Sequence, residues 1–254
     1  MLVLGTGTSH GVPMIGCDCG TCTSNDPRDR RTRASILVTT PDGFAVLVDT
    51  TPDLRSQALA HNVRRVDAIA YTHSHADHVM GLDDVRRFNV LQRAAIPCYG
   101  DERTIGDLRR IFSYIFDPHT ARGGGLPQVV PMRVVGEFCI GQSTFIPIPL
   151  MHGSRGILGY RVGSFAYLTD CSDIPETSWP LLQGVRTVIL DALRDRPHPT
   201  HLSVGQAVAI VERIAPERAY FTHMCHDLPH AATCARLPSG VELAYDGLAF
   251  EIPL

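Results

Sequence analysis

The 254-residue chain has 44% hydrophobic and 19% charged residues, an ordinary globular composition that excludes the intrinsically disordered and fibrous classes. A formal net charge of -3 argues against the broad basic surface with which many proteins hold nucleic acid. All 23 basic residues are arginine, and the lack of lysine excludes Schiff-base catalysis, pyridoxal phosphate anchoring and a phosphate-loop lysine.

The first predicted elements are a hairpin, a helix and a buried strand. Ser35–Thr40 and Phe44–Asp49 flank a Pro-Asp-Gly turn and predict the two strands of the hairpin. Pro52–His61 predicts a helix with proline in its first turn, and Asp67–Tyr71 predicts a buried strand. Upstream of them, we interpret the arginine-rich segment Arg28–Arg33 as a solvated loop, because acidic residues lie beside it.

Strands and helices continue to alternate along the rest of the chain, without an internal repeat or an obvious linker. We therefore expect a single domain over residues 1–254, of the α/β (α+β) class, in which layered sheets are covered by helices. The glycine-rich segment Asp117–Gln128 predicts a mobile loop. Further strands are predicted at Val129–Val135, Ser143–Ile148, Gly156–Val162, Phe165–Leu168, Thr187–Leu190 and Arg218–Phe221, and helices at Glu102–Ile111, Pro175–Leu182 and Ser203–Ile214.

Apolar runs in the chain are shorter than the roughly 18 residues that a membrane helix needs. The N-terminal segment also lacks the pattern of a secretory signal peptide. We therefore expect a soluble, cytoplasmic protein with no membrane partner. The cysteine usage agrees with this expectation, because the eight cysteines are too unevenly spaced for a secreted disulfide framework.

The strongest motif, His73-Ser74-His75-Ala76-Asp77-His78, follows the predicted strand that ends at Tyr71. Extended backbone at His73 and His75 puts their side chains on one face of the chain. A turn into a helix then points Asp77 and His78 to a neighbouring position. The motif therefore predicts two adjacent metal ions served by one loop, in place of a histidine-rich surface turn.

One loop cannot fill two coordination spheres, so further ligands are expected where other strands end at the same sheet edge. His152, Asp170 and His223 each follow a predicted strand. Taken alone, each residue also fits a surface or capping role. Because all three share this placement, we predict that they complete the metal site.

Such a site creates a nucleophile without a nucleophilic side chain. Two divalent ions roughly 3.5–4 Å apart acidify a bridging water, and the resulting hydroxide attacks the substrate. We expect Asp77 to orient that water in addition to binding metal. Imidazole and carboxylate ligands accept zinc, manganese, iron or nickel, and the metals suit hydrolysis at phosphorus or at an acyl carbon.

This combination resembles the metallo-β-lactamase superfamily, whose motif runs H-x-H-x-D-H and continues with His, Asp and His after later strands. The segments Leu4–Ser9 and Val48–Thr50 are also similar to that family's first-strand loop and second-strand aspartate. The resemblance covers nearly the whole chain and implies a four-layered αββα sandwich with metals at the sheet edge. It implies that His73, His75 and His152 hold one ion and Asp77, His78 and His223 the other, with Asp170 bridging.

A separate metal site is indicated by Cys17, Cys19 and Cys22, which crowd into one short loop. These thiols are too close together to join distant parts of a fold, and a closed zinc site needs a fourth ligand. His226 is the predicted fourth ligand, and Cys225 is its competitor. We therefore expect one structural zinc in addition to two divalent ions, manganese or zinc, at the active site.

The cysteine loop narrows the resemblance to the PhnP-like phosphodiesterases of that superfamily. The stretch Gly5–Pro13 that leads into the cysteines is similar to that branch, as are Leu168–Asp170 and Thr222–His226. The resemblance implies hydrolysis of small cyclic phosphate diesters such as phosphoribosyl 1,2-cyclic phosphate. Arginines would receive a further phosphate, but the sequence does not single out which ones.

The same resemblance places His201 at the position of an active-site histidine. A protonated His201 would donate its proton to the leaving oxygen. The alternative for His201 is a structural role, as a residue that flanks a helix capped by Ser203. His198 is the neighbouring candidate for the catalytic role.

Other functions use the same ligands. A ribonuclease similar to tRNase Z would carry a protruding RNA-binding arm, which the sequence lacks, so we do not expect nucleic acid as a partner. A lactone or thioester hydrolase is a further alternative, and a metal-holding module without turnover is the non-enzymatic one. We expect a small-molecule phosphodiester as substrate and a possible homodimer.

Overall fold

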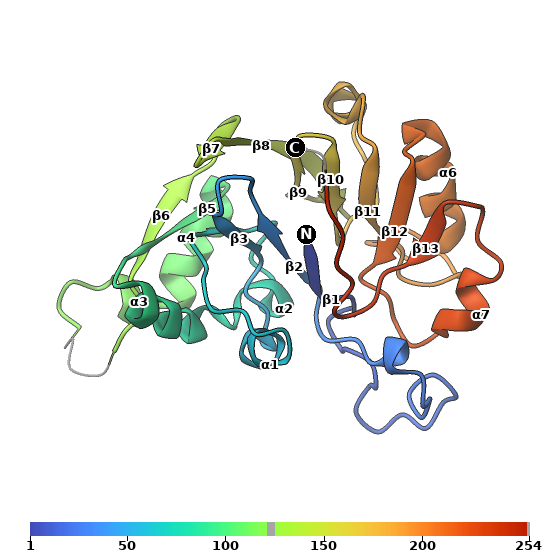
Figure 1. Cartoon of the computed structure of the whole chain (residues 1–254), viewed down its shortest axis with the longest axis horizontal. Helices are drawn as coiled ribbons and strands as arrows, with labels where there is room; N and C mark the ends of the chain where they lie inside the picture. Colours follow the sequence, from blue (N-terminus) through green and yellow to red (C-terminus); the bar gives the residue numbers. More distant parts are fainter. Residues whose placement is uncertain (121–124, 253–254) are drawn as a thin grey trace.

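The computed structural model describes residues 1–120 and 125–252, which form two β-sheets packed face to face (Figure 1). The strand order in the first sheet follows the chain, from β1 to β6. Its first three strands are antiparallel neighbours and its last four are parallel neighbours. The strands are β1 (Leu2–Gly5), β2 (Ser35–Thr39), β3 (Ala45–Val48), β4 (Ala68–Ala70), β5 (Ile96–Gly100) and β6 (Val129–Arg133).

The second sheet has the order β13-β12-β11-β10-β9-β8-β7. Neighbours from β7 to β10 are antiparallel, whereas β10 to β13 run parallel. Parallel strands end at one edge of the sheet, where their loops gather side chains into a site. The strands are β7 (Phe138–Ile140), β8 (Ser143–His152), β9 (Arg155–Val162), β10 (Phe165–Leu168), β11 (Thr187–Asp191), β12 (Arg218–Thr222) and β13 (Val241–Leu243).

Helices cover the outer face of each sheet, so the molecule has four layers and the predicted αββα sandwich is confirmed (Figure 1). On the first sheet, apolar side chains of the helices pack against strand residues such as Leu47. The helices of that layer are α1 (Leu54–Ala60), α2 (Ala76–Val79), α3 (Arg86–Gln92), α4 (Glu102–Ile111) and α5 (Ser113–Phe116). The second sheet carries α6 (Val204–Ile214) and α7 (His230–Cys234). Short 3-10 helices span Pro27–Asp29, Leu82–Val85 and Glu176–Leu182.

Apolar side chains from both sheets form the core between them. Val46 and Val48 of β3 share this cluster with Tyr167 of β10 and Ile189 of β11. Leu47, which lies between the two valines, instead packs under the helices of the first sheet. This alternation is the two-residue period of a strand that is buried on both faces.

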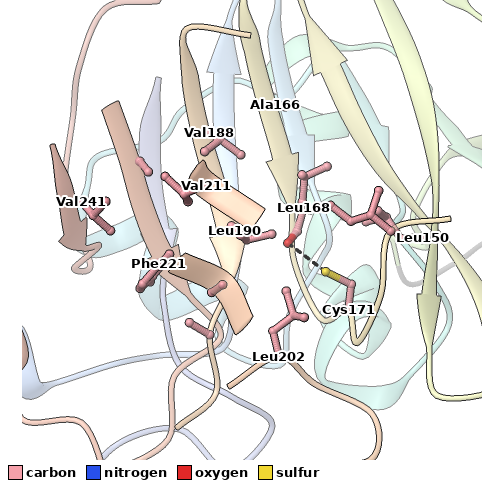
Figure 2. Close-up of a cluster of buried hydrophobic side chains, with 14 of the residues drawn as sticks. Leu150, Ala166, Leu168, Cys171, Val188, Leu190, Leu202, Val211, Phe221 and Val241 are labelled. Atoms are coloured by element: carbon pink, nitrogen blue, oxygen red, sulfur yellow. Dashed lines mark hydrogen bonds between the residues drawn. The ribbon is translucent and has the colours of Figure 1, made fainter. Parts of the chain in front are cut away.

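Figure 2 shows the core cluster under α6, beside the edge at which the parallel strands end. Leu168, Leu190 and Phe221 of three neighbouring strands pack there with Cys171 and Leu202. Cys171 and Leu202 directly follow Asp170 and His201 in the chain, which are two residues of the predicted site. Burial of these side chains therefore holds the backbone next to the site.

The segment predicted as a helix over Pro175–Leu182 is a 3-10 helix over Glu176–Leu182. Pro180 lies inside it and has no backbone N–H to donate to an α-helical hydrogen bond. By contrast, α6 has the predicted serine cap, because the Ser203 hydroxyl accepts from the Gln206 N–H and the Gln206 side chain accepts in return.

The arginine-rich segment is solvated at Arg28 and Arg30, as the sequence predicted, but the prediction is wrong for Arg31. The side chain of Arg31 is fully buried and pairs with the Asp29 carboxylate at 3.2 Å. It also donates to the carbonyl oxygens of Cys225 and Leu228, so the loop is anchored beside the residues that follow β12. These partners satisfy the two terminal nitrogens of a guanidinium that would be costly to bury alone.

Two further predictions concern loops and membranes. Residues 121–124 of the predicted mobile loop Asp117–Gln128 lie outside the described residues. Within the described part of the chain, no helix has the length and apolar character needed to cross a membrane.

Candidate metal centre

The H-x-H-x-D-H segment leaves the buried strand β4 and turns into the short helix α2, as its pattern predicted. His75 precedes the helix with extended backbone, and Asp77 and His78 lie within it. The rings of His73 and His75 lie 4.5 Å apart between centroids. His73 and His78 are buried, so their ring nitrogens are withdrawn from water.

Asp170, which follows β10, lies at the centre of the histidine cluster. Its Oδ2 atom lies 3.0 Å from Nε2 of His73 and 3.2 Å from Nε2 of His78. Its Oδ1 atom lies 3.2 Å from Nδ1 of His152 and 3.0 Å from Nδ1 of His201. Four imidazoles from three segments of the chain therefore point ring nitrogens at one buried carboxylate.

Asp77 and His223 lie on a second side of the Asp170 carboxylate. Nε2 of His223 lies 3.6 Å from an Asp77 oxygen and 3.8 Å from Oδ1 of Asp170. The ligand atoms of Asp77, His78, Asp170 and His223 all lie within 4.8 Å of one another. A second group of this kind is formed by His73, His75 and Asp170. The structure thus brings together the seven residues predicted at this edge.

Backbone conformation sets the site residues apart from ordinary strand ends. Asp49, Asp170 and His223 follow β3, β10 and β12 and have φ angles of 65°, 57° and 58°. Residues other than glycine rarely adopt this left-handed region, which costs on the order of 1–3 kcal/mol. Such conformations gather at functional sites, where the surrounding structure holds them, and here they turn three side chains toward one centre.

Asp49, which follows β3, orients the loop that contains His73, His75 and His78. Its carboxylate accepts from the Thr72 N–H and hydroxyl at 2.8 Å each, and it lies 2.7 Å from Nδ1 of His78. A hydrogen bond at Nδ1 leaves Nε2 of His78 facing Asp77 and Asp170. Asp49 therefore selects the ring nitrogen that His78 presents to the site.

Asp191 plays a related part on the opposite side, and sequence reasoning missed it. It ends β11, is fully buried, and accepts from the Leu202 N–H at 2.9 Å. Its second oxygen lies 3.5 Å from Nδ1 of His201 and 3.6 Å from Nδ1 of His223. The signal was present, because Asp191 directly follows a predicted strand, as Asp170 nearly does.

A third set of contacts holds Ser74, which lies between His73 and His75 in the loop. The Ser74 hydroxyl donates to the Asp107 carboxylate of α4 and accepts from Arg155 at 2.8 Å. Arg155 lies opposite His152 in the β8–β9 hairpin. The sequence carried no signal for this contact, because the three residues are far apart in the chain.

At this centre, burial and neighbouring charges shift pKa values in opposite directions. Burial would raise the pKa of the Asp170 carboxyl, but the histidines around it, His223 foremost, hold it well below its usual range. Burial lowers the pKa of His73 to about 3. For His201, burial also disfavours the charged form, yet the carboxylates of Asp170 and Asp191 raise its pKa to about 10. The centre thus holds an anionic carboxylate among both neutral and cationic imidazoles.

The donor atoms at this centre fit a divalent metal. Nε2 of His73, Nε2 of His78, Nδ1 of His152 and both ring nitrogens of His223 are buried and have no hydrogen-bond partner among the described residues. Unpartnered buried nitrogens are costly, and a cation among them removes that cost. Imidazole nitrogens with carboxylate oxygens suit zinc, manganese, iron or nickel. Metal binding is therefore the chemistry that this set of side chains supports.

The cysteine loop forms a second cluster of ligand atoms. The sulfurs of Cys17, Cys19 and Cys22 lie 3.1, 3.4 and 3.6 Å from Nδ1 of His226. The four ligand atoms lie within 4.8 Å of one another, as a tetrahedral site requires. Cys225 does not belong to this group. An N–H from Cys22 lowers the pKa of the Cys19 thiol to about 7, whereas burial raises that of Cys22 to about 11.

His201 lies inside the cluster, whereas His198 lies at its rim. The His201 ring stacks on that of His223 with centroids 4.9 Å apart. His198 has its centroid 4.9 Å from that of His201, and its Nδ1 accepts from the Thr200 N–H. Of the two histidines, His201 is therefore the one in contact with Asp170.

A cavity of about 300 Å³ opens beside His201 and extends to the cysteine cluster at His226. Arg194, Arg196 and His198 line its walls from one side. The N-terminal loop that contains His10 forms the other side. His201 is the residue that this cavity shares with the histidine–aspartate cluster.

The family description "Beta-lactamase superfamily domain" matches residues 45–224, which include every candidate residue of the histidine–aspartate centre. A solved structure described as a new diphosphatase from the PhnP family is 48% identical to this chain. It superposes with a TM-score of 0.92 and covers 100% of this chain and 97% of its own. The fold is therefore that of the matched family and of this solved structure.

Two curated relatives carry other names. An octanoyltransferase from Porphyromonas gingivalis is 35% identical over 97% of this chain, and this chain spans 50% of that protein's length. A coenzyme PQQ synthesis protein B from Xanthomonas euvesicatoria is 31% identical, with 99% of both chains covered. These names describe different activities, so likeness alone leaves the substrate of this chain open.

Proposed function

Because this chain belongs to the beta-lactamase superfamily and is a metal-dependent hydrolase, we propose that it cleaves small cyclic phosphate diesters, with phosphoribosyl 1,2-cyclic phosphate as the type of substrate. The main observation in support is the environment of the Asp170 carboxylate. Buried imidazoles surround it, and their facing ring nitrogens have no hydrogen-bond partners among the described residues. Support for phosphorus chemistry comes from the 48% identity to a PhnP-family diphosphatase.

We assign the ligands to two divalent ions. His73, His75 and His152 would hold one ion, and Asp77, His78 and His223 would hold the other, with Asp170 shared between them. When bound, the ions would supply Lewis acidity, which lowers the pKa of a water and offsets charge that develops on phosphate oxygens. Imidazole and carboxylate oxygen ligands suit manganese and zinc alike.

The chain's own residues then orient the reactants and move one proton. Asp49 orients the ring of His78, and an oxygen of Asp191 lies 3.5 Å from Nδ1 of His201 and 3.6 Å from Nδ1 of His223. Asp77, with an oxygen 3.6 Å from His223, is placed to accept a hydrogen bond from the attacking water. His201, whose Nδ1 lies 3.0 Å from Asp170 and 3.5 Å from Asp191, would donate a proton to the leaving oxygen.

We also propose a structural zinc held by Cys17, Cys19, Cys22 and His226. The arrangement of three sulfurs and one imidazole nitrogen within 4.8 Å supports it. The site ties the N-terminal loop to the segment that follows His223, so it would stabilise one wall of the catalytic edge.

A second candidate is the hydrolysis of a diphosphate, that is, a P–O–P anhydride. It is favoured by one observation, the likeness of this chain to a 48% identical solved structure that is described as a diphosphatase. Both reactions displace an oxygen from phosphorus, so the same side chains serve either one.

A substrate panel tests the proposal and separates the candidates. Manganese- or zinc-loaded protein is offered phosphoribosyl 1,2-cyclic phosphate, a 2',3'-cyclic nucleotide, a dinucleoside diphosphate, a lactone and short single-stranded RNA. We expect the highest kcat/KM for the phosphoribosyl substrate. A higher value for the diphosphate favours the second candidate, and turnover only of the lactone or only of RNA contradicts phosphate diester specificity.

Asp170→Asn is the matched variant for this panel. It removes the shared carboxylate charge, and we expect kcat/KM to fall by about 10³-fold or more, because the ions contribute several kcal/mol to the transition state. Asp42→Asn in the β2–β3 turn is the control, since it removes a carboxylate far from the centre. Full activity in Asp170→Asn would refute the assignment.

A further inference from the structure

The three histidines assigned to one of the two ions come from different sheets. His73 and His75 lie in the loop that follows β4 of the first sheet, and His152 ends β8 of the second. The ring centroid of His152 lies 5.6 Å from that of His73 and 5.1 Å from that of His75. Ligand–metal distances tolerate deviations of only about 0.2 Å. Binding of this ion therefore requires that the loop and the β8–β9 hairpin are held at one separation.

Arg155 joins the hairpin to that loop beside His152. The two residues are opposite each other in the register of β8 and β9. The Arg155 guanidinium donates to the Ser74 hydroxyl at 2.8 Å, and Ser74 lies between His73 and His75 in the chain. One hydrogen bond therefore connects the partner of His152 in the hairpin with the residue between the other two histidines.

The far end of this bridge is fixed to the helical layer of the first sheet. The Ser74 hydroxyl donates in turn to the Asp107 carboxylate of α4, and the Arg155 guanidinium lies 3.9 Å from the same oxygen. Hydrogen bonds to charged groups are stronger than those between neutral groups. The Arg155 side chain is only 14% exposed, so little water competes for these contacts. The bridge of Arg155, Ser74 and Asp107 therefore has fixed partners at both ends.

The two segments that the bridge joins are also held by contacts that do not involve Arg155. In the hairpin, the Gly153 N–H donates to the Ser172 hydroxyl at 2.9 Å. Farther along β9, the Leu158 N–H donates to the Thr72 carbonyl at 3.0 Å and keeps the sheets together below the site. Loss of the Arg155 bond should therefore alter the spacing of the two segments at the site and leave the fold intact.

Ligands assigned to the other ion have their own connection between the sheets. Met224, next to His223, exchanges backbone hydrogen bonds with Thr6 and Thr8, which follow β1 of the first sheet. These bonds are 2.9 and 3.1 Å long. The position of His223 relative to the first sheet therefore does not depend on Arg155.

We propose that Arg155 is a positioning residue for one of the two ions, the one assigned to His73, His75 and His152. Its bridge sets the separation of the two segments that hold this ion, so the affinity for this ion depends on Arg155. The affinity for the other ion does not. This inference rests on the proposed function, in which two ions share Asp170.

Manganese titration of protein freed of metal at the centre tests the proposal, because imidazole and carboxylate ligands accept manganese whereas thiolates select zinc. The wild-type centre should bind two ions. In Arg155→Met, which removes the donors of the side chain, the affinity for one ion should fall about tenfold or more, and the affinity for the other should stay the same. A wild-type centre that binds one ion, or two unchanged affinities in Arg155→Met, would overturn the proposal.

Electron paramagnetic resonance gives a second readout that a general loss of stability would not change. With manganese added between the two dissociation constants of the variant, wild-type protein should give the spectrum of a coupled pair, and Arg155→Met that of isolated ions. A coupled pair in Arg155→Met under these conditions would overturn the proposal.

A double-mutant cycle identifies the ion that Arg155 affects. His152→Ala removes a ligand of the ion in question, so adding Arg155→Met to it should leave the affinity of the remaining ion unchanged. A further loss of affinity in the double variant would assign the effect of Arg155 to the other ion and overturn the proposal.

Arg161→Met is the matched control. Arg161 lies at the other end of β9 and donates to the carbonyl oxygens of Leu181 and Gln183. Its substitution should lower the melting temperature without changing either metal affinity. Ser74→Ala removes the middle of the bridge and should weaken the same ion as Arg155→Met. Equal weakening of both ions in Arg155→Met, or the same selective loss in Arg161→Met, would overturn the proposal.

Hydrolysis measurements separate this inference from the proposed function. Saturating manganese should bring kcat of Arg155→Met for phosphoribosyl 1,2-cyclic phosphate close to the wild-type value, because Arg155 acts through metal binding. A kcat that stays low with both ions bound would overturn the proposal. Selective loss of one ion without hydrolysis of any phosphate substrate by the wild type would support the role of Arg155 and refute the proposed function. Hydrolysis by a protein whose metal affinities do not depend on Arg155 would refute the positioning role alone.

Discussion

Asp170 shows how one side chain depends on its neighbours at this centre. Its oxygens lie within 3.2 Å of ring nitrogens of four histidines, but these contacts lack the geometry of hydrogen bonds. Burial of such a group without a compensating cation is costly. The carboxylate and its imidazoles are therefore best explained as ligands arranged for positive charge.

The contact between Asp49 and His78 makes a test of ligand orientation. Asp49→Asn keeps the shape of the side chain but removes the carboxylate that receives Nδ1–H of His78 at 2.7 Å. We expect metal affinity to fall about 10- to 100-fold, as for other supports of ligating histidines, while the far-ultraviolet spectrum stays unchanged. Competition with a chelating dye measures the affinity directly.

Asp83→Asn is the control for this comparison, since Asp83 is a partly exposed carboxylate paired with Arg86 outside the centre. Its metal affinity should match that of the wild type. An unaltered affinity in Asp49→Asn as well would contradict the assigned role of Asp49.

Asp246 makes a prediction about pH that is separate from catalysis. Burial raises the pKa of its carboxyl to about 6, although Thr6 and Thr32 donate to it at 2.7–2.8 Å. Between the unfolded pKa near 3.9 and the folded value, the folded state binds more protons. Its contribution to stability is therefore complete below about pH 4 and is lost as the pH rises to 6, by on the order of 2–3 kcal/mol.

Urea unfolding of the wild type and of Asp246→Asn at several pH values between 4 and 7 measures this loss. The difference in unfolding free energy between them should shift in favour of Asp246→Asn as the pH rises. Metal ligands titrate in both proteins, so their effect cancels in the difference. Parallel curves across this range would contradict a raised pKa for Asp246.

At the scale of elements, the site depends on how strands end and on what lies under their loops. Three strands finish in left-handed residues that turn Asp49, Asp170 and His223 toward the same edge. Cys171 and Leu202, which directly follow Asp170 and His201 in the chain, are buried in the hydrophobic cluster of Figure 2. Regular strands and a packed core together hold strained residues in place.

Leu202→Ala tests this support. The side chain is 2% exposed, so the truncation should lower the unfolding free energy by about 2–4 kcal/mol through lost burial and an added cavity. Because the Leu202 N–H also donates to Asp191, we expect a larger loss of kcat/KM than in Leu182→Ala, which truncates an equally buried leucine of the same cluster. Unfolding curves and initial rates measure the two effects, and equal kinetic losses in both variants would contradict the coupling.

The sequence predicted elements correctly where turn or capping residues bound an apolar run, and incorrectly where other residues decide the local conformation. The hairpin around Pro41, the strand before His73 and the capped helix after Ser203 appear as predicted. The helix predicted over Pro175–Leu182 contains Pro180, whose missing N–H leaves a 3-10 helix. Strand β5 was missed, since its five residues include Pro97 and a glycine.

The candidate site was predictable to the extent that it follows strands. The H-x-H-x-D-H motif, Asp170 and His223 stand at strand ends and were found by that rule, and Asp191 was overlooked although it obeys the same rule. Arg31 was misread because its buried partners, Asp29 apart, lie almost 200 residues away. Contacts of that kind depend on the packing of the two sheets, which local patterns do not contain.

At the scale of the whole molecule, the segment that follows β12 connects the two clusters of candidate metal ligands. His223 belongs to the histidine–aspartate centre, and His226, three residues later, belongs to the cysteine cluster. A metal at the cysteines would therefore brace the loop that carries His223. The homodimer and the cytoplasmic location stay predictions from sequence.

Cys22→Ser tests the structural zinc. We expect the variant to lose one equivalent of zinc and to unfold at a melting temperature lower by roughly 5 °C or more, because metal binding contributes to folding free energy. Cys139→Ser, which alters an exposed cysteine outside the cluster, should change neither quantity. Elemental analysis and calorimetric melting measure both, and unchanged zinc content in Cys22→Ser would contradict the site.

The most direct test of the account is the rate of phosphoribosyl 1,2-cyclic phosphate hydrolysis as metal is removed from the protein and returned. We predict that chelation abolishes hydrolysis, and that titration with manganese or zinc restores it as two equivalents bind in wild-type protein but not in Asp170→Asn. Undiminished hydrolysis by protein shown to be free of metal, or full restoration in Asp170→Asn, would contradict a metal-dependent hydrolase centred on Asp170.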